Sequence, residues 1–301
     1  MSDNSSTKPY HGQRRPTAAP TGVAEGVAMT AENQRADMQG AHCDVPADLW
    51  RACPDCNQLL YARDLEANLW VCDKCGSHFR LSVWQRLQVT VDADSFTVWD
   101  GDLPLTDPLD FPDYLGKAQK AREKTGMSEA ALTGRATLDG IPLAIGLMDL
   151  SFIGGSMGWG VGELVTRLME RAIDQHLPVV IFCASGGARM QESLISLMQM
   201  AKTSGAAGRL RAAGLPYISV LTHPTYGGVT ASFAFLGDFI IAEQGAAMGF
   251  AGPRVVEVTG LRMPPGVQTA EFQYEHGMID MLLPRREIRP ALHTMLRWCM
   301  L

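Results

Sequence analysis

Three pairs of adjacent glycines recur in the second half of this 301-residue chain, and each stands where an apolar run gives way to a helical pattern. The pairs are Gly154-Gly155, Gly186-Gly187 and Gly227-Gly228, so their spacings are 32 and 41 residues. Each spacing suits about one strand and one helix. The alternation predicts a layered α/β fold with parallel strands, and the three junctions predict a repeated superhelical turn whose loops line one cleft.

A glycine pair at the start of a helix needs an explanation, because glycine lowers helix stability and loses more entropy on folding. Close packing of helix on strand would explain a single pair. Three pairs favour a shared function, since the first N–H groups of a helix have no partner and lie at its positive end. Bare backbone admits a phosphate, a carboxylate or an oxygen that becomes negative during reaction. We interpret the loops as an oxyanion hole for an enolate.

Other uses of such loops fit the sequence less well. The phosphate-binding pattern GxxxxGK[ST] is absent, and the stretch from Gly154 to Gly160 only loosely approaches a dinucleotide fingerprint. Ser185 precedes a glycine pair, but no GxSxG elbow surrounds it. His223 is the best base by sequence context, although a histidine before a proline at a strand end is more often a loop residue.

Two Cys-x-x-Cys pairs predict a metal site upstream of the glycine loops. Their ligands would be Cys53, Cys56, Cys72 and Cys75. Two such knuckles separated by 15 residues are typical of a tetrahedral four-thiolate zinc site, which is structural because no coordination position stays open. A redox role is the alternative. Nucleic-acid binding through this module also stays open, although its basic residues alternate with acidic ones.

Composition limits the remaining classes. A net charge of −6 disfavours nucleic acid as the main partner, and no apolar run reaches the length of a membrane span. The odd count of seven cysteines fits a reducing compartment, so we expect a cytoplasmic protein. The polar segment 1–48 predicts a disordered extension, with a transit peptide as the alternative. Residues 49–80 would form the zinc ribbon and 81–301 the main domain.

Two local patterns in the main domain are specific enough to test. Asp139-Gly140 stands between the apolar runs ALTGRATL and IPLAIGLMD, which predicts a β-hairpin with a tight turn. The run 161–176 predicts an amphipathic helix. Its apolar face would comprise Val161, Leu164, Val165, Leu168 and Ala172.

Several long segments resemble one family. They are FIGGSMG (152–158), ASGGARMQESLISLMQMAKTS (184–204), PYISVLTHPTYGGVTASFAFLGD (216–238), GFAGPRVVE (249–257) and EFQYEHGMIDM (271–281). Together with the upstream zinc module, they are similar to the β subunit of bacterial and plastid acetyl-CoA carboxylase carboxyltransferase, over about residues 50–290.

The resemblance implies a crotonase-like ββα superhelix with an N-terminal zinc ribbon. It implies an α2β2 transferase that works with biotin carboxylase and the biotin carboxyl carrier protein. That enzyme moves the carboxyl group from carboxybiotin to acetyl-CoA and forms malonyl-CoA for fatty-acid synthesis. Biotin would be carried on a partner and its pocket would lie on the α subunit, so this chain alone would be an incomplete enzyme.

The resemblance also implies roles for individual residues. The N–H groups of Gly227 and Gly228 would hold the enolate oxygen, and Gly186 and Gly187 would shape the thioester pocket. The base would be the ureido nitrogen of biotin. Candidates for binding the phosphates of CoA are Arg189, Lys202 and Arg254, for each of which a solvated or structural role is equally open.

The chain departs from the family pattern near the proposed hole. His223 stands where the family has Asp, Tyr226 stands where Met is common, and Trp159 interrupts a run of smaller residues. These departures keep open a paralogous acyl-CoA carboxylase or decarboxylase subunit of a specialised pathway. A nucleic-acid-binding or regulatory role of the zinc ribbon is the other alternative.

Overall fold

The computed structural model describes residues 49–260 and 262–300, without the side chains of Pro253 and Arg254. The predicted disordered extension over 1–48 therefore lies outside the described residues. No helix within the described ranges is both long and apolar enough to cross a bilayer.

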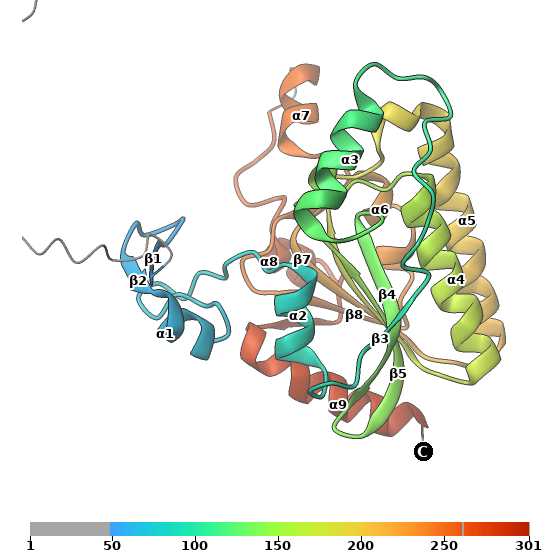
Figure 1. Ribbon diagram of the computed structural model, residues 1–301. Coiled ribbons are helices and arrows are strands. Elements are labelled where there is room, and N and C mark those ends of the chain that lie inside the picture. Colours follow the sequence, from blue (N-terminus) through green and yellow to red (C-terminus); the bar gives the residue numbers. More distant parts are fainter. Residues whose placement is uncertain (1–48, 261, 301) are drawn as a thin grey trace, which may run out of the picture. The chain divides into compact units, whose positions relative to one another are not determined.

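One mixed sheet organises the main domain, in the order β10-β8-β7-β6-β5-β4-β3, with β9 beside β7 (Figure 1). The pairs from β5 to β10 and the pair of β7 with β9 are parallel, while β3, β4 and β5 pair antiparallel. The strands are β3 (Thr97–Trp99), β4 (Ala131–Leu138), β5 (Ile141–Met148), β6 (Val179–Ser185), β7 (Tyr217–Tyr226), β8 (Phe239–Glu243), β9 (Met248–Gly249) and β10 (Met281–Leu283). The predicted parallel α/β sheet is confirmed.

The predicted hairpin is the β4–β5 pair. Leu138 faces Ile141 across a two-residue turn, in which Asp139 has a φ of 48° and Gly140 a φ of 80°. Two consecutive positive φ values define the primed turn that matches strand twist, and Asp-Gly is a favoured sequence for it.

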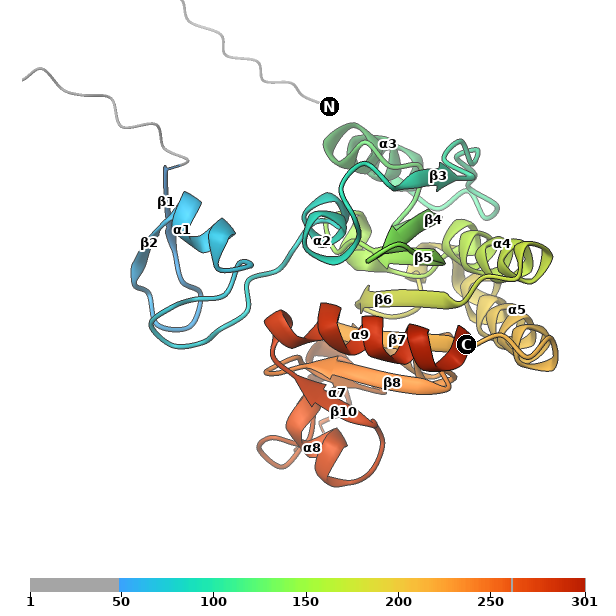
Figure 2. The ribbon, with the colours of Figure 1, turned by 90° about the horizontal axis from the view of Figure 1, so that it is seen from below.

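Helices cover both faces of the sheet. A Cβ on Gly146 of β5 would meet Leu168 of α4 (Trp159–Gln175), whereas the next residue, Leu147, lines a small cavity with Arg86 of α2 (Val83–Thr90). Because successive strand residues point to opposite faces, α4 and α2 lie on opposite sides. In Figure 2, α9 (Arg285–Met300) lies in front of the sheet and roughly along β7 and β8, and α9 contacts α2. α5 (Ser193–Ala212) packs beside α4.

The amphipathic pattern of α4 is confirmed, since every residue of its predicted apolar face is buried. The remaining helices are short or peripheral: α3 (Tyr114–Thr125), α6 (Gly227–Thr230), α7 (Pro253–Thr259) and α8 (Ala270–Glu275).

The cysteine module has a core of its own. It comprises β1 (Trp50–Ala52), β2 (Leu59–Tyr61) and α1 (Ala62–Ala67), packed around Leu60, Leu65 and Trp70. The buried residues of the ribbon core end at Cys72, and those of the large core of the sheet begin at Val83. We therefore propose that the boundary between ribbon and main domain lies near residue 80, as the sequence predicts.

Candidate active site and zinc centre

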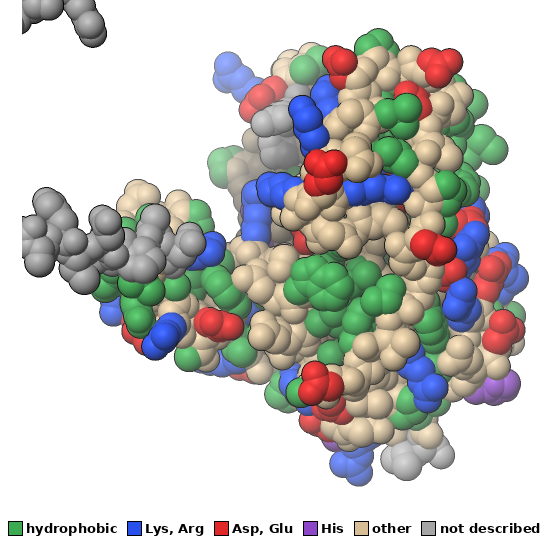
Figure 3. All heavy atoms as spheres, viewed as in Figure 1, with side chains coloured by type: hydrophobic (Ala, Val, Ile, Leu, Met, Phe, Trp, Pro, Cys, Tyr) green, Lys and Arg blue, Asp and Glu red, His purple; other side chains and the backbone are tan. Residues whose placement is uncertain are grey.

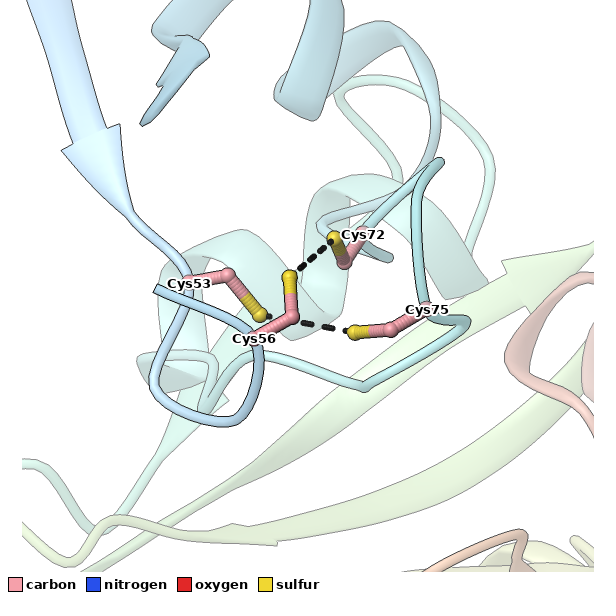
Figure 4. A group of neighbouring side chains, drawn as sticks. All are labelled: Cys53, Cys56, Cys72 and Cys75. Atoms are coloured by element: carbon pink, nitrogen blue, oxygen red, sulfur yellow. Dashed lines mark hydrogen bonds between the residues drawn. The ribbon is translucent and has the colours of Figure 1, made fainter. Parts of the chain in front are cut away.

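The four predicted zinc ligands converge on one point (Figure 4). The Sγ atoms of Cys53 and Cys75 are 3.6 Å apart and those of Cys56 and Cys72 are 3.8 Å apart. A tetrahedral zinc with Zn–S bonds of about 2.3 Å requires sulfur separations of about 3.8 Å, so the donor set fits zinc. No fifth protein ligand or open position is required, and the site is structural.

A buried ion cluster attaches this ribbon to the sheet. Arg285 donates to the carbonyl oxygens of Leu69 (3.0 Å), Trp70 (3.1 Å) and Phe79 (2.9 Å), and also to Glu243 at 2.9 Å. Arg86 donates to the same carboxylate at 2.6 Å. Burial alone would raise the pKa of Glu243, but Arg86 and then Arg285 hold it well below its usual value. Glu243 is therefore ionised and bridges two arginines.

The second and third glycine pairs face each other because β6 and β7 are parallel neighbours that end at the same edge. A Cβ built on Gly187 would lie 3.2 Å from Cα of Gly227. These two glycines have φ values of 115° and 62°, which L side chains rarely adopt. A Cβ on Gly228 would lie 3.3 Å from Cβ of Ala188. The loops approach so closely that a Cβ at any of these positions would make contacts tighter than ordinary van der Waals distance.

The first glycine pair braces the second. The N–H of Gly186 donates to Gly154 O at 2.9 Å, and the hydroxyl of Ser185 donates to Gly155 O at 2.6 Å. The same hydroxyl oxygen accepts the N–H of Gly187 at 3.0 Å. Ser185 is thus a buried structural residue, which agrees with the absence of a serine-hydrolase elbow.

Two backbone donors stay available where the loops meet. In the part of the chain that the structure describes, no hydrogen bond uses the N–H of Ala188 or of Gly228. The residues on either side of Ala188 are fixed by Met157, whose N–H donates to Gly187 O and whose carbonyl accepts the N–H of Arg189. Ala188 was missed from sequence, although it directly follows a glycine pair at a strand end.

Gly228 lines a cavity of about 360 Å³, and Ala188 lies in the adjoining loop. Gly227 and Gly228 form one wall, Met200 and Ala201 of α5 form another, and Phe250 adds an aromatic side chain. The lining is mainly apolar, which suits a neutral thioester better than a charged group.

Of the predicted phosphate-binding cations, neither Arg189 nor Lys202 lines this cavity. Arg189 is 0% exposed and donates to both carboxylate oxygens of Glu129, at 2.9 and 2.7 Å. Its burial argues against a phosphate contact. Lys202 is 34% exposed and forms an ion pair with Glu163. The side chain of Arg254 lies outside the described residues.

Arg189 instead belongs to a buried cluster that holds the loops together. It also donates to Glu192 (3.2 Å), to the hydroxyl of Tyr114 (2.9 Å) and to Ser156 O (2.9 Å). Glu192 in turn accepts the N–H of Trp159 at the start of α4. Burial lowers the pKa of Arg189, but Glu129 outweighs this and raises it overall, so the guanidinium stays charged.

Comparison with known proteins identifies the family to which this chain belongs. The carboxyl transferase domain model matches residues 78–270, and the acetyl-CoA carboxylase zinc finger domain model matches residues 50–75. The acetyl-coenzyme A carboxylase carboxyl transferase subunit beta of Desulforamulus reducens is 52% identical over 84% of this chain and 88% of its own length. The protein of the same name from Synechococcus sp. (strain JA-3-3Ab) is 53% identical over 84% and 82%, respectively.

Solved structures agree on the fold. Transcarboxylase 12S with methylmalonyl-coenzyme A bound superposes with a TM-score of 0.61 at 28% identity, over 72% of this chain and 40% of that larger chain. A malonate decarboxylase heterodimer from Pseudomonas matches with a TM-score of 0.56 at 23% identity, over 73% of this chain and 86% of that chain, and shows the fold alone. The predicted crotonase-like fold with a zinc ribbon is confirmed. On these matches, the chain belongs to the family of acetyl-coenzyme A carboxylase carboxyl transferase β subunits, and it is the carboxyltransferase subunit that carries the structural zinc.

Proposed function

We propose that this β subunit, paired with an α subunit as an α2β2 transferase, carboxylates acetyl-CoA to malonyl-CoA. The observation that carries the proposal is the available N–H of Gly228 at the wall of an apolar cavity, with the available N–H of Ala188 in the adjoining loop. The partner proteins would be biotin carboxylase and the biotin carboxyl carrier protein. We propose the cytoplasm as its compartment, where reducing conditions keep the four thiolates available to zinc.

The chemistry requires a negative oxygen at the thioester. The methyl group of acetyl-CoA loses a proton, its electron pair forms the bond to the transferred carboxyl carbon, and the thioester oxygen bears the charge meanwhile. Carboxybiotin, held by a partner, would supply the carboxyl group as its bond from nitrogen to the carboxyl carbon breaks, and the freed nitrogen would take the proton. The chain's own residues contribute preorganised donors, and one such donor is typically worth about 3 kcal/mol of transition-state stabilisation.

A partner at this site also agrees with the surface around it. Met190 is 81% exposed just before α5, Leu194 and Met198 are exposed on α5, and Phe250, which lines the cavity, is 76% exposed. Leu197, from the same exposed part of α5, lines the cavity. Because this apolar surface continues into the cavity, we propose that the α subunit covers it and completes the site.

A nucleic-acid role is supported less well. On the face drawn in Figure 3, basic and acidic side chains are interspersed and form no basic stripe. A phosphate backbone is bound by such stripes, so the surface in that view offers no footprint for it.

The decisive variant is Gly228→Ala in the α–β complex. Its methyl group would lie 3.3 Å from Ala188 Cβ and 3.2 Å from Met200 Sδ, so Ala188 or Met200 must shift by a few tenths of an ångström beside the donors. We expect malonyl-CoA formation to fall about 100-fold or more, mainly in kcat. Gly208→Ala on α5 is the matched control, because its Cβ would meet nothing within 4 Å.

Near-normal turnover of Gly228→Ala would refute the oxyanion hole. Activity of the wild-type complex with propionyl-CoA or butyryl-CoA, but not with acetyl-CoA, would refute the substrate and favour a paralogous acyl-CoA carboxylase.

A further inference from the structure

Arg80 and His223 meet at the wall of a second, larger cavity. Nη2 of Arg80 lies 3.4 Å from Nε2 of His223. The cavity measures about 870 Å³ and is lined by the ribbon, by the segment that follows it, and by the ends of β7 and β8. Neither glycine loop of the proposed oxyanion hole lines it.

The other ring nitrogen of His223 determines where the imidazole carries its proton. Nδ1 lies 3.1 Å from the backbone nitrogen of Ala247, and a backbone N–H can only donate. Nδ1 is therefore the unprotonated acceptor. A neutral imidazole has one acceptor and one donor, so Nε2 carries the hydrogen. Burial, and then the positive charge of Arg80, lower the pKa of His223, which keeps the ring neutral.

Two donors consequently face each other across 3.4 Å, because a guanidinium has no acceptor atom. Neither group can accept a hydrogen bond from the other. An acceptor with two or more lone pairs, placed between them, would satisfy both and neutralise the charge of Arg80. We propose that Arg80 and His223 form a binding site for a small oxyanion of the phosphate or carboxylate class.

The charges around Arg80 and His223 determine how tightly an anion is expected to bind. Glu243, which also lines the cavity, forms ion pairs with both Arg86 and Arg285. Because two positive charges face one negative charge, this cluster has a net charge of about +1. Asp55 and the zinc-bound thiolate of Cys75 line the same cavity and oppose an anion. We therefore expect weak binding, with a dissociation constant in the millimolar range, that depends on the two facing donors rather than on a strong positive field.

The experiment titrates inorganic phosphate into the full-length, zinc-loaded protein at constant ionic strength, with chloride as the balancing ion. Line broadening in phosphorus NMR measures affinity, and nitrogen NMR of labelled histidine side chains locates the ion. We expect a saturable shift of His223 Nε2 with phosphate and none with chloride. Arg80→Gln should weaken binding at least tenfold, whereas Arg63→Gln, an exposed ribbon cation, should leave it unchanged.

His223→Asp is the sharper variant. Its carboxylate can accept from both Ala247 N–H and Arg80, so the fold should be retained while the need for an external acceptor disappears. Zinc content and the unfolding midpoint should match wild type, and phosphate affinity should fall at least tenfold. Phosphate binding that persists in this variant, or that is equal in Arg80→Gln, means an adventitious ion only and overturns the site, as does the absence of saturable binding.

Competition identifies the source of the anion. If coenzyme A displaces phosphate and pantetheine does not, the occupant is a phosphate of the coenzyme. If neither displaces it, the ligand is the free ion. Both results support the site, which is independent of the carboxyl transfer proposed above and can be tested without turnover.

Discussion

Two buried arginine clusters, one around Arg189 and one around Arg285, connect different parts of the molecule. The cluster of Arg189 joins side chains of Glu129, Glu192 and Tyr114, which are contributed by segments of a single core. The cluster of Arg285 joins Glu243 of the sheet to three main-chain carbonyls of the zinc module, 206 to 216 residues earlier in the chain.

The difference lies in what each cluster fixes. Around Arg189, hydrogen bonds to Ser156 O and through Met157 hold the glycine loops, so the geometry of Ala188 N–H depends on this cluster. Arg285 instead binds main-chain carbonyls of the zinc ribbon, and the ribbon's own apolar core and four cysteines already define its shape. We infer that the first cluster supports catalysis and stability together, whereas the second mainly sets where the ribbon sits.

Removing zinc should have the largest effect, and only the zinc ribbon with its Arg285 contacts should be disrupted. Metal binding contributes about 10–16 kcal/mol to the folding of small zinc modules. We expect a chelator to unfold residues 49–80, release the carbonyl partners of Arg285 and leave the sheet folded. Hydrogen exchange should show new exposure at Trp70 and retained protection at Val180; loss of protection at both would contradict the separation of the two cores.

Arg189→Met should have the next largest effect. It leaves Glu129 and Glu192 buried without their cation, and breaking such a pair typically costs about 3–5 kcal/mol. Urea unfolding measures the loss, and kcat of the α–β complex should fall with it. Arg285→Met is the comparison variant, because Arg86 still neutralises Glu243 there.

For Arg285→Met we expect a smaller loss of stability, retained zinc, and cleavage by a protease between the ribbon and α2. Equal losses of kcat in the two variants would show that the clusters do not differ in function.

Acid should give the smallest effect and distinguish the ribbon cluster. The folded-state pKa of Glu243 lies well below its unfolded value near 4.5, so its stabilising contribution is present above about pH 4.5. That contribution is lost as the pH falls through the folded pKa. Comparing the pH dependence of unfolding of wild type and Glu243→Gln isolates this contribution, and the two profiles should converge only below about pH 4.5. Convergence already at pH 6 would contradict the shift.

Local patterns predicted whatever depends on near neighbours in the sequence. The two Cys-x-x-Cys knuckles indicated zinc because each knuckle is a local turn, and Asp139-Gly140 indicated a hairpin because the turn chemistry needs only two residues. The glycine pairs indicated facing loops because parallel strands end at one edge. For Arg189 the sequence left a phosphate contact and a structural role equally open, since an arginine in a sequence carries no sign of whether acids elsewhere will bury it.

Sequence patterns alone therefore predict the zinc ribbon, the alternating strands and helices, and the glycine junctions at their ends. Three features emerge only once the chain is folded: Ala188 supplies an available N–H, Glu129 and Tyr114 enclose Arg189, and His223 turns a donor toward Arg80. Turns, periodicity and metal knuckles form within a few residues, whereas burial and hydrogen-bond partners depend on segments 60 to 143 residues apart.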